Sequence, residues 1–242
     1  MTEVETSQGK VMVPYEVRRR KGARYIKLSI GNQNHAVLSV PERCPMAQAM
    51  EFLRSQGTWL EENLKEHPTR SSLTKYLQAN PRLYGLGHVF QLTLQFTQVK
   101  PFYLYDTAAG EIVMRLRQGE DTEQELLVLC RGFASEVITA RTLQLAKKWQ
   151  LHVKRVTVRD QSSRWGSCSC KATISLNWRL VLLRPHLQDH IILHELAHLK
   201  EMNHGSRFWE LLRRFDPRTD QHNSQLNPAA ARLMPLGRVT AQ

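Results

Sequence analysis

The spacing of hydrophobic residues predicts mainly β-structure in the first half of the chain. Alternating apolar and polar positions favour strands, and Pro41 ends the third of them because proline cannot donate to a strand ladder. Pro45 suits the first turn of a helix, and apolar residues at steps of three and four predict that this helix runs over about 45–65. The strands expected before it are 15–18, 25–30 and 35–40.

A second β-region is expected after residues 67–81, which we interpret as a linker. Residues 89–97 alternate apolar and polar side chains, and the turn-forming segment 106–110 separates two further short runs, 102–105 and 111–116. Three consecutive strands joined by short turns predict a meander.

Helices around two strands are expected in the second half. Apolar residues at steps of three and four extend over 122–150, where Gly132 is the expected position of a kink. Strands are expected at 153–159 and 172–182, and Pro185 marks the end of the second strand.

Two more helices are expected beyond that proline. The first begins near residue 186, and the second begins near Ser206, whose side chain can cap it. Pro217 ends the second helix, and the residues beyond 226 are expected to be irregular.

Together these patterns predict an α+β protein with two regions. Residues 1–118 form a β-rich N-terminal region with the helix at about 45–65, and residues 119–242 form the second region. A chain of 242 residues is long enough for one large domain or two modest ones, each with its own core.

The helix expected after Pro185 carries His194, Glu195 and His198, the residue types of a metal hydrolase. Residues four apart lie on one face of a helix, so both imidazoles can bind one metal ion at about 2.0–2.1 Å from each nitrogen. Glu195 lies roughly 100° around the helix from His194, beside the metal and not on it. From there it can hold a water molecule and accept its proton, as a general base does.

A catalytic zinc site usually has a third protein ligand and leaves one position open. His204 is favoured, because the asparagine and glycine on either side of it tolerate left-handed backbone and predict a turn that folds it back. Glu201 is the alternative, since it falls seven residues after His194 and on the same helical face. Glu210, in the next segment, is a weaker alternative.

Several motifs around these residues carry a family resemblance. The motifs are Ser163–Cys168, Ile174–Asn177, His194–His198, Asn203–His204 and Phe208–Trp209. With them the chain resembles the YgjP-like metallopeptidases, relatives of the SprT-like and WLM proteins in the zincin group. The resemblance implies a zincin-like catalytic core in 119–242, a zinc cofactor and a peptide substrate. It also implies His194, His198 and His204 as zinc ligands and Glu195 as the catalytic residue.

The sequence departs from related zincins at two points. Metzincin proteases have a glycine where this chain has Glu201, so the turn to the third histidine must form differently, and Asn203 is its expected position. SprT-like proteins often add a cysteine-rich zinc ribbon, whereas the four cysteines here contain no CxxC pair. A second metal site is therefore not expected, and Cys168 and Cys170 are too close together for a relaxed disulfide.

Composition favours a cytoplasmic protein. The chain begins without a basic segment followed by an apolar one, so no signal peptide is expected, and no run approaches the ~18 apolar residues that span a bilayer. The formal net charge is +12, with a basic cluster over 18–27. This excess attracts polyanions, but the cluster alternates like a strand whose charges discourage aggregation. Nucleic-acid binding is the less favoured interpretation.

The sequence thus predicts a zinc-dependent metallopeptidase that hydrolyses peptide or protein substrates. A substrate strand could pair with a sheet edge at 164–168 or 172–177, and Trp165 is expected in the cleft or in the core. One alternative is a nucleic-acid-associated protein with structural zinc, although such a site usually has four protein ligands and leaves Glu195 without a role. Another is a zinc hydrolase of non-peptide amides or esters, because the motif specifies an activated water and not the substrate.

Overall fold

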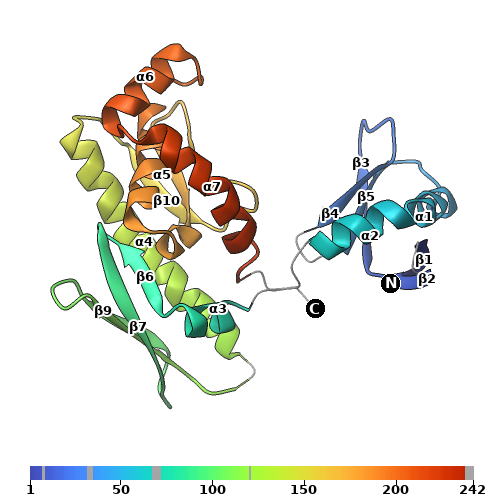
Figure 1. Ribbon diagram of the computed structural model, residues 1–242, viewed down its shortest axis with the longest axis horizontal. Coiled ribbons are helices and arrows are strands. Elements are labelled where there is room, and N and C mark those ends of the chain that lie inside the picture. Colours follow the sequence, from blue (N-terminus) through green and yellow to red (C-terminus); the bar gives the residue numbers. More distant parts are fainter. Residues whose placement is uncertain (7–8, 32–34, 67–71, 120, 238–242) are drawn as a thin grey trace. The chain divides into compact units, whose positions relative to one another are not determined.

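A computed structural model describes residues 1–6, 9–31, 35–66, 72–119 and 121–237 of the chain (Figure 1). Contacts between residues divide it into two compact units, one within residues 1–71 and one formed by residues 72–237. Helices and mixed sheets occur together, which confirms the predicted α+β class. The division falls between residues 71 and 72, whereas the sequence predicted it between 118 and 119.

The N-terminal unit combines small sheets with two helices. Its elements are β1 (Thr2–Thr6), β2 (Gly9–Val13), β3 (Tyr15–Arg20), β4 (Lys27–Gly31), β5 (His35–Pro41), α1 (Met46–Ser55) and α2 (Gly57–Glu66). The three predicted strands are confirmed as β3, β4 and β5. The helix predicted over 45–65 is interrupted at Gln56, and a Cβ on Gly57 would lie 1.7 Å from the backbone oxygen of Glu5. The backbone of β1 therefore occupies the space that any side chain at position 57 would need.

The larger unit holds the predicted metal ligands. Its elements are α3 (Leu73–Ala79), β6 (Arg82–Gly85), β7 (His88–Phe96), β8 (Phe102–Asp106), β9 (Glu111–Leu116), α4 (Thr122–Lys148), β10 (Arg155–Arg159), β11 (Gly166–Cys168), β12 (Thr173–Asn177), the 3₁₀-helix η1 (Trp178–Leu182), α5 (Pro185–Ala197), α6 (Ser206–Phe215) and α7 (Thr219–Leu233). Helix α4 contacts both sheets of this unit as well as η1 and α5 (Figure 1). Strands β6–β9 share one hydrophobic core with α4, so they belong with the helices of the larger unit and not with the N-terminal strands.

One arrangement of three strands recurs in three sheets, and we call it the inserted-strand arrangement. In each case the last strand lies between the first two, parallel to the first and antiparallel to the second. The strand orders are β3-β5-β4, β7-β9-β8 and β10-β12-β11. The predicted meander over 89–116 is therefore wrong, because β9 pairs with β7 in parallel and separates it from β8.

A short helix, α3, stands in the described part of the predicted linker; residues 67–71 of that linker lie outside the described residues. The carboxylate of Glu123 accepts hydrogen bonds from the backbone N–H groups of Leu73 and Thr74 and from the hydroxyls of Ser72 and Thr74. The backbone N–H groups in the first turn of α3 thus donate to a side chain on α4. The spacing of apolar residues within one segment cannot reveal such a contact.

Four other predicted features differ from the structure. The strand predicted over 172–182 ends at Asn177, whose side chain accepts from the backbone N–H of Arg179 and caps η1. Ser206 is the first residue of α6, and the N-cap is Gly205, without a side-chain bond. The tail beyond 226 continues as α7 to Leu233. Helix α4 is one element through Gly132, where a Cβ would lie 3.1 Å from the Tyr103 ring, so this glycine allows close packing.

A buried arginine ties the end of the described chain to this core. The Arg179 side chain is fully buried, and its guanidinium donates to the backbone oxygen of Leu236 at 2.9 Å from Nε and to Oδ1 of Asp160. Arg131, on α4, pairs with the same carboxylate from the more exposed side. The Asp160 carboxylate therefore balances the charge of Arg179 inside the fold, and the Leu236 carbonyl and Oδ1 of Asn177 are further acceptors.

We expect Asp160→Asn to lower the free energy of unfolding by on the order of 3 kcal/mol, because it leaves a buried guanidinium without its counter-charge. Denaturant-induced unfolding measures this change. Arg131→Gln is the matched control, since it removes the exposed partner of the same carboxylate and should cost under about 1 kcal/mol. Equal losses in the two variants would contradict the role given to the buried pair.

Candidate metal centre

Helix α5 positions the first three predicted site residues on the buried side of the larger unit. It begins at Pro185 and places His194, Glu195 and His198 in its last turns. The chain leaves helical geometry after Ala197, earlier than the predicted turn at Asn203. Glu201 therefore no longer lies on a helical face with His194, which removes the reason for considering its carboxylate as a ligand.

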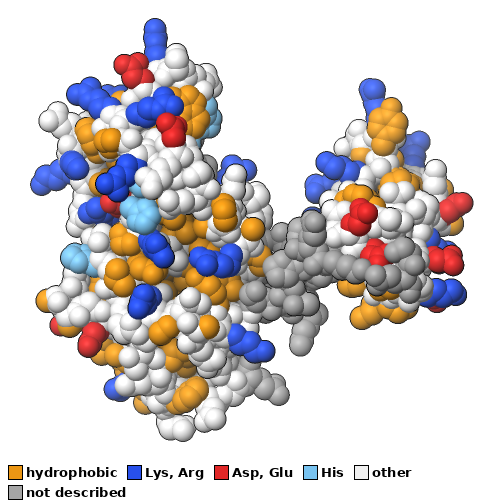
Figure 2. Space-filling model, in the orientation of Figure 1, with side chains coloured by type: hydrophobic (Ala, Val, Ile, Leu, Met, Phe, Trp, Pro, Cys, Tyr) orange, Lys and Arg blue, Asp and Glu red, His pale blue; other side chains and the backbone are white. Residues whose placement is uncertain are grey.

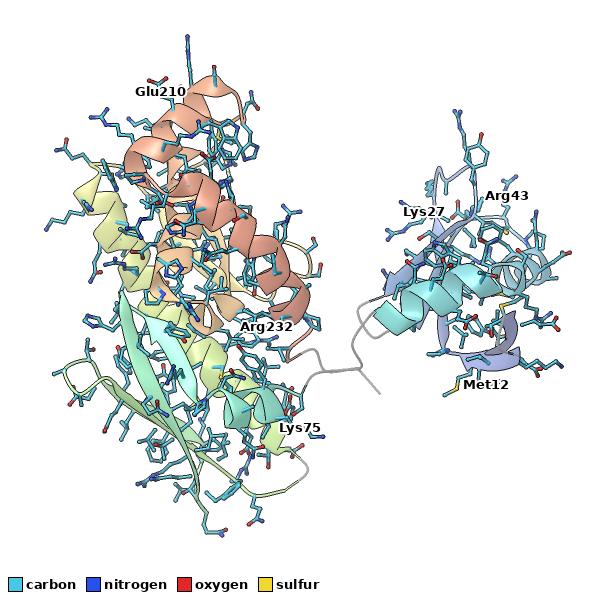
Figure 3. The ribbon with its side chains drawn as sticks, in the orientation of Figure 1. Met12, Lys27, Arg43, Lys75, Glu210 and Arg232 are labelled. Atoms are coloured by element: carbon cyan, nitrogen blue, oxygen red, sulfur yellow. The ribbon has the colours of Figure 1, made fainter. Side chains whose placement is uncertain are left out.

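The turn after α5 brings His204 back to the two helical histidines. Nε2 of His204 lies 3.0 Å from Nε2 of His194, and the ring centroids of His198 and His204 are 4.7 Å apart. One ligand atom from each of the three histidines lies within 4.8 Å of the others. Glu210 is exposed on α6 and takes no part in this group (Figure 3).

Phe208 holds the three imidazole rings in place. It is fully buried on α6, stacks on the ring of His198 at 4.6 Å, and meets the rings of His194 and His204 edge-on at 4.9 and 4.7 Å. The indole N–H of Trp209 donates to the backbone oxygen of His204 at 3.1 Å. Helix α6 thus supports the histidine group from behind, through the Phe-Trp pair that the sequence motif included.

The protonation of this group suits a divalent cation. Burial and the neighbouring histidines lower the pKa of His194 to about 3, and burial lowers the pKa of His198. Neutral imidazoles are the form that binds metal. Nδ1 of His198 lies 3.0 Å from the backbone oxygen of Glu201, so this nitrogen is the donor and Nε2 is left to face the group. The three nitrogens are therefore suited to hold a divalent metal ion.

Glu195 stands beside the histidines against the backbone of β11. It is 6% exposed, and a Cβ added to Gly166 would lie 2.7 Å from its Oε1. Burial raises the pKa of Glu195 to about 7, against the opposing charge of Arg164. Gly166 is the first residue of β11, and its lack of a side chain leaves the space that the carboxylate occupies.

We expect Gly166→Ala to lower kcat/KM by about a hundredfold, because the new methyl group displaces the Glu195 carboxylate by a distance on the order of 1 Å. Bound metal should be retained, since the three atoms nearest to the new methyl group all belong to Glu195 and not to the histidines. Gly205→Ala is the matched control: nothing lies within 4 Å of a Cβ there, and its φ of −76° suits any residue. Unchanged activity in Gly166→Ala would contradict the close approach.

The loop before β11 is fixed by Asn177. This buried residue donates from its side-chain nitrogen to the backbone oxygens of Gln161 at 2.9 Å and Arg164 at 3.0 Å. Its backbone N–H donates to the oxygen of Trp165 at 2.8 Å. Asn177 therefore positions the Arg164–Gly166 segment and does not face the reacting groups.

The sequence reasoning missed a second group of titratable residues, which joins α5 to the segment after α6 and to α7. His190 and His222 both approach Oδ2 of Asp216 through Nδ1, at 2.5 and 2.8 Å, and all three residues are buried. Both contacts join an imidazole nitrogen to a carboxylate oxygen at hydrogen-bond distance, and Nε2 of His190 lies 3.0 Å from Oδ1 of Asn223. The group links α5 to α7. Its signal in the sequence is a histidine at every fourth position of α5, at 186, 190, 194 and 198.

The family model described as "YgjP-like, metallopeptidase domain" matches residues 24–229. The chain belongs to the YgjP-like metallopeptidase family. The resemblance carried by the motifs is thereby confirmed, and this YgjP-like protein is a metal-dependent hydrolase. No curated protein matches the chain. None of the helices within the described ranges is both long and apolar enough to cross a membrane.

Two solved structures are similar to the YgjP-like chain over part of its length. One is the metallopeptidase zymogen abylysin from Pyrococcus abyssi, with 22% identity, a TM-score of 0.35, and coverage of 38% of this chain and 93% of that one. The other is the metallopeptidase zymogen jannalysin from Methanocaldococcus jannaschii, with 24% identity, a TM-score of 0.35, and coverage of 38% and 95%.

The YgjP-like site opens into a cavity of about 230 Å³ next to Glu195. Trp165, Ile191 and Leu226 give it apolar walls, while His190 and Asn223 contribute polar groups. Trp165 is half-buried and also packs against the core, so both of its expected locations apply. The cavity is smaller than the roughly 300–1,000 Å³ of sites for whole ligands, so its size suits a single side chain.

Proposed function

We propose that this YgjP-like protein is a zinc peptidase in which His194, His198 and His204 hold the zinc ion and Glu195 transfers the proton. The observation that carries this proposal is the position of the buried Glu195 carboxylate over Gly166, on the same helix as two of the three grouped histidines. Zinc is the proposed metal because three imidazoles with an open fourth position are typical of catalytic zinc sites.

Each residue then has a defined task. A zinc ion supplies a Lewis acid that polarises the scissile carbonyl and makes a water molecule more acidic. Glu195 orients that water, accepts its proton and passes it to the leaving amine. A pKa raised by burial favours acceptance of the proton, because the carboxylate is then a stronger base than an exposed glutamate.

Strand β11 offers the place where a peptide could align. In the sheet β10-β12-β11 it is an edge strand that pairs with β12 alone among the described strands, and its Gly166 contacts Glu195. A peptide added to this edge would pass the metal with its backbone extended, and one side chain could enter the cavity beside Trp165. The alternative edge at 172–177 is excluded, because β12 is the central strand.

The alternative functions are less well supported. A structural zinc site would need a fourth protein ligand, and the group found among the described residues contains the three histidines without one. A non-peptide amide or ester as substrate is not favoured by membership of a metallopeptidase family.

The experiment that tests the proposal is metal removal and replacement with a peptide library as substrate. We expect the zinc-loaded protein to cleave peptides, the chelated protein to lose at least about 99% of that activity, and one equivalent of zinc to restore it, because the metal both polarises the carbonyl and activates the water. Mass spectrometry of the products identifies the new termini. Cleavage that continues at full rate after the zinc has been removed would exclude the proposal.

A further inference from the structure

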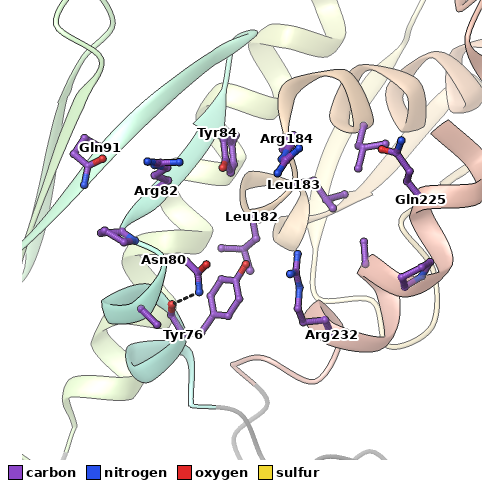
Figure 4. Close-up of a pocket in the computed structure, with 15 residues that line it drawn as sticks. Tyr76, Asn80, Arg82, Tyr84, Gln91, Leu182, Leu183, Arg184, Gln225 and Arg232 are labelled. Carbon is purple, nitrogen blue, oxygen red and sulfur yellow. Dashed lines mark hydrogen bonds between the residues drawn. The ribbon is translucent and has the colours of Figure 1, made fainter. Parts of the chain in front are cut away.

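A second and larger cavity lies in the same unit, away from the histidine group. Its volume is about 730 Å³, within the range of small-molecule sites. Its walls come from α3, β6, β7, the junction between η1 and α5, and α7 (Figure 4). Its lining residues do not include any of those that line the cavity beside Glu195.

Three arginines from three different elements surround this cavity. Arg82 lies on β6, Arg184 is the N-cap of α5, and Arg232 lies on α7 (Figure 4). No acidic residue lines the cavity, and none of the three guanidinium groups forms an ion pair or hydrogen bond within the described residues. Arg141, by contrast, is paired in two bonds with Asp189 on α5. The cavity therefore carries three positive charges that the fold does not neutralise.

The start of α5 adds to this positive field. The helix is thirteen residues long, has no acidic residue in its first turn, and has no side-chain cap at Arg184. Its N-terminus carries a partial positive charge that attracts anions. On the face of residues 72–237 that Figure 2 shows, blue side chains are also more frequent than red ones.

The remaining walls are aromatic and amide groups. Tyr76 and Tyr84 are half-buried in the cavity, and Arg232 is near enough to Tyr76 to oppose the rise of its pKa that burial causes. Asn80, Gln91 and Gln225 supply neutral donors and acceptors. Aromatic rings beside guanidinium groups suit a ligand that has a flat ring as well as negative charge.

We propose that this cavity binds a nucleoside polyphosphate or a similarly compact ligand with several phosphoryl groups. Guanidinium groups bind phosphate oxygens through paired N–H donors, and three of them match the charge of a polyphosphate chain better than that of a single carboxylate. The site is separate from the proposed peptidase centre: Arg184 and His194 are ten residues apart on α5, or about 15 Å along the helix. Binding here can be measured without any peptidase activity.

The test is calorimetric titration of the zinc-loaded protein with ATP in excess Mg²⁺, so that ATP does not withdraw zinc. We expect saturable binding of one ATP per chain, and at least a tenfold loss of affinity in the double variant Arg184→Gln/Arg232→Gln. The matched control is Arg207→Gln/Arg214→Gln, which removes the same charge from α6, outside the cavity, and should bind ATP within about twofold of the wild type. All of these side chains are exposed, and thermal unfolding checks that each variant is folded.

Further titrations separate the sources of the signal. Tripolyphosphate should compete with ATP, and adenosine alone should compete at least tenfold less well. Equal loss of ATP affinity in the two double variants would show that ATP responds to the net charge of the protein, and would overturn the assignment of ATP to this cavity. Tighter binding of hexaglutamate than of ATP would overturn the phosphoryl assignment and indicate an acidic peptide segment as the ligand. Absence of ATP binding would overturn the proposal directly.

Discussion

Glu195→Gln is expected to lower kcat/KM for peptide cleavage by at least about 10²–10⁴-fold, which is the range that a positioned acid–base group contributes. The amide keeps the shape of the carboxylate against Gly166 but cannot accept a proton from water. Zinc content should stay at that of the wild type, because Glu195 is not a member of the histidine group. Activity and zinc are measured together on the same preparations.

Glu201→Gln is the matched control for this change. It is the same substitution six residues further on, at a residue whose backbone oxygen, and not its carboxylate, contacts His198. We expect it to retain most of the activity. A Glu195→Gln variant that cleaves peptides at the wild-type rate would remove Glu195 from the mechanism, and one that has lost its zinc would show that the carboxylate helps to hold the metal.

The second large effect concerns the third ligand. His204→Ala is expected to weaken zinc binding by more than about a hundredfold, a larger loss than the 10–100-fold typical of residues that only support a ligand. Its Nε2 lies 3.0 Å from that of His194, and no other residue from the turn joins the group among the described residues. Competitive titration with a chelator measures the affinity.

Glu201→Ala should leave zinc affinity nearly unchanged in the same titration, because the carbonyl that accepts from His198 Nδ1 belongs to the backbone and survives the substitution. If the two results are exchanged, Glu201 is the ligand. If neither variant loses zinc, the proposed ligand set is wrong, and Glu210, which is exposed on α6, would have to be tested next.

The elements that the sequence predicted correctly are those that depend on residues close to one another along the chain. The periodic run over 122–150 and the four-residue step from His194 to His198 depend on neighbours within one helix, and both appear as expected in α4 and α5. The turn to His204 was also predicted, although it begins after Ala197 and not at Asn203. Local backbone preferences are enough for these features.

The features that escaped prediction depend on partners far along the chain. Helix α3 takes its N-terminal acceptor from Glu123, and the parallel pairing of β7 with β9 replaces the simpler meander. His190 is joined to Asp216, which lies 26 residues further on in the turn between α6 and α7. The role of Gly166 follows from the Glu195 carboxylate that faces it, and no periodicity indicates that approach.

The inserted-strand arrangement has a consequence for the order in which the chain folds. In β8-β9 and in β11-β12 the antiparallel pair is joined by only a few residues, so it can close as a hairpin within about 1–10 μs. The parallel partners, β7 and β10, must close longer loops and are expected to join later. If β10 paired with β11 first, β12 could not enter between them. The hairpin of β11 and β12, whose Gly166 faces Glu195, is therefore expected to form before β10 joins the sheet.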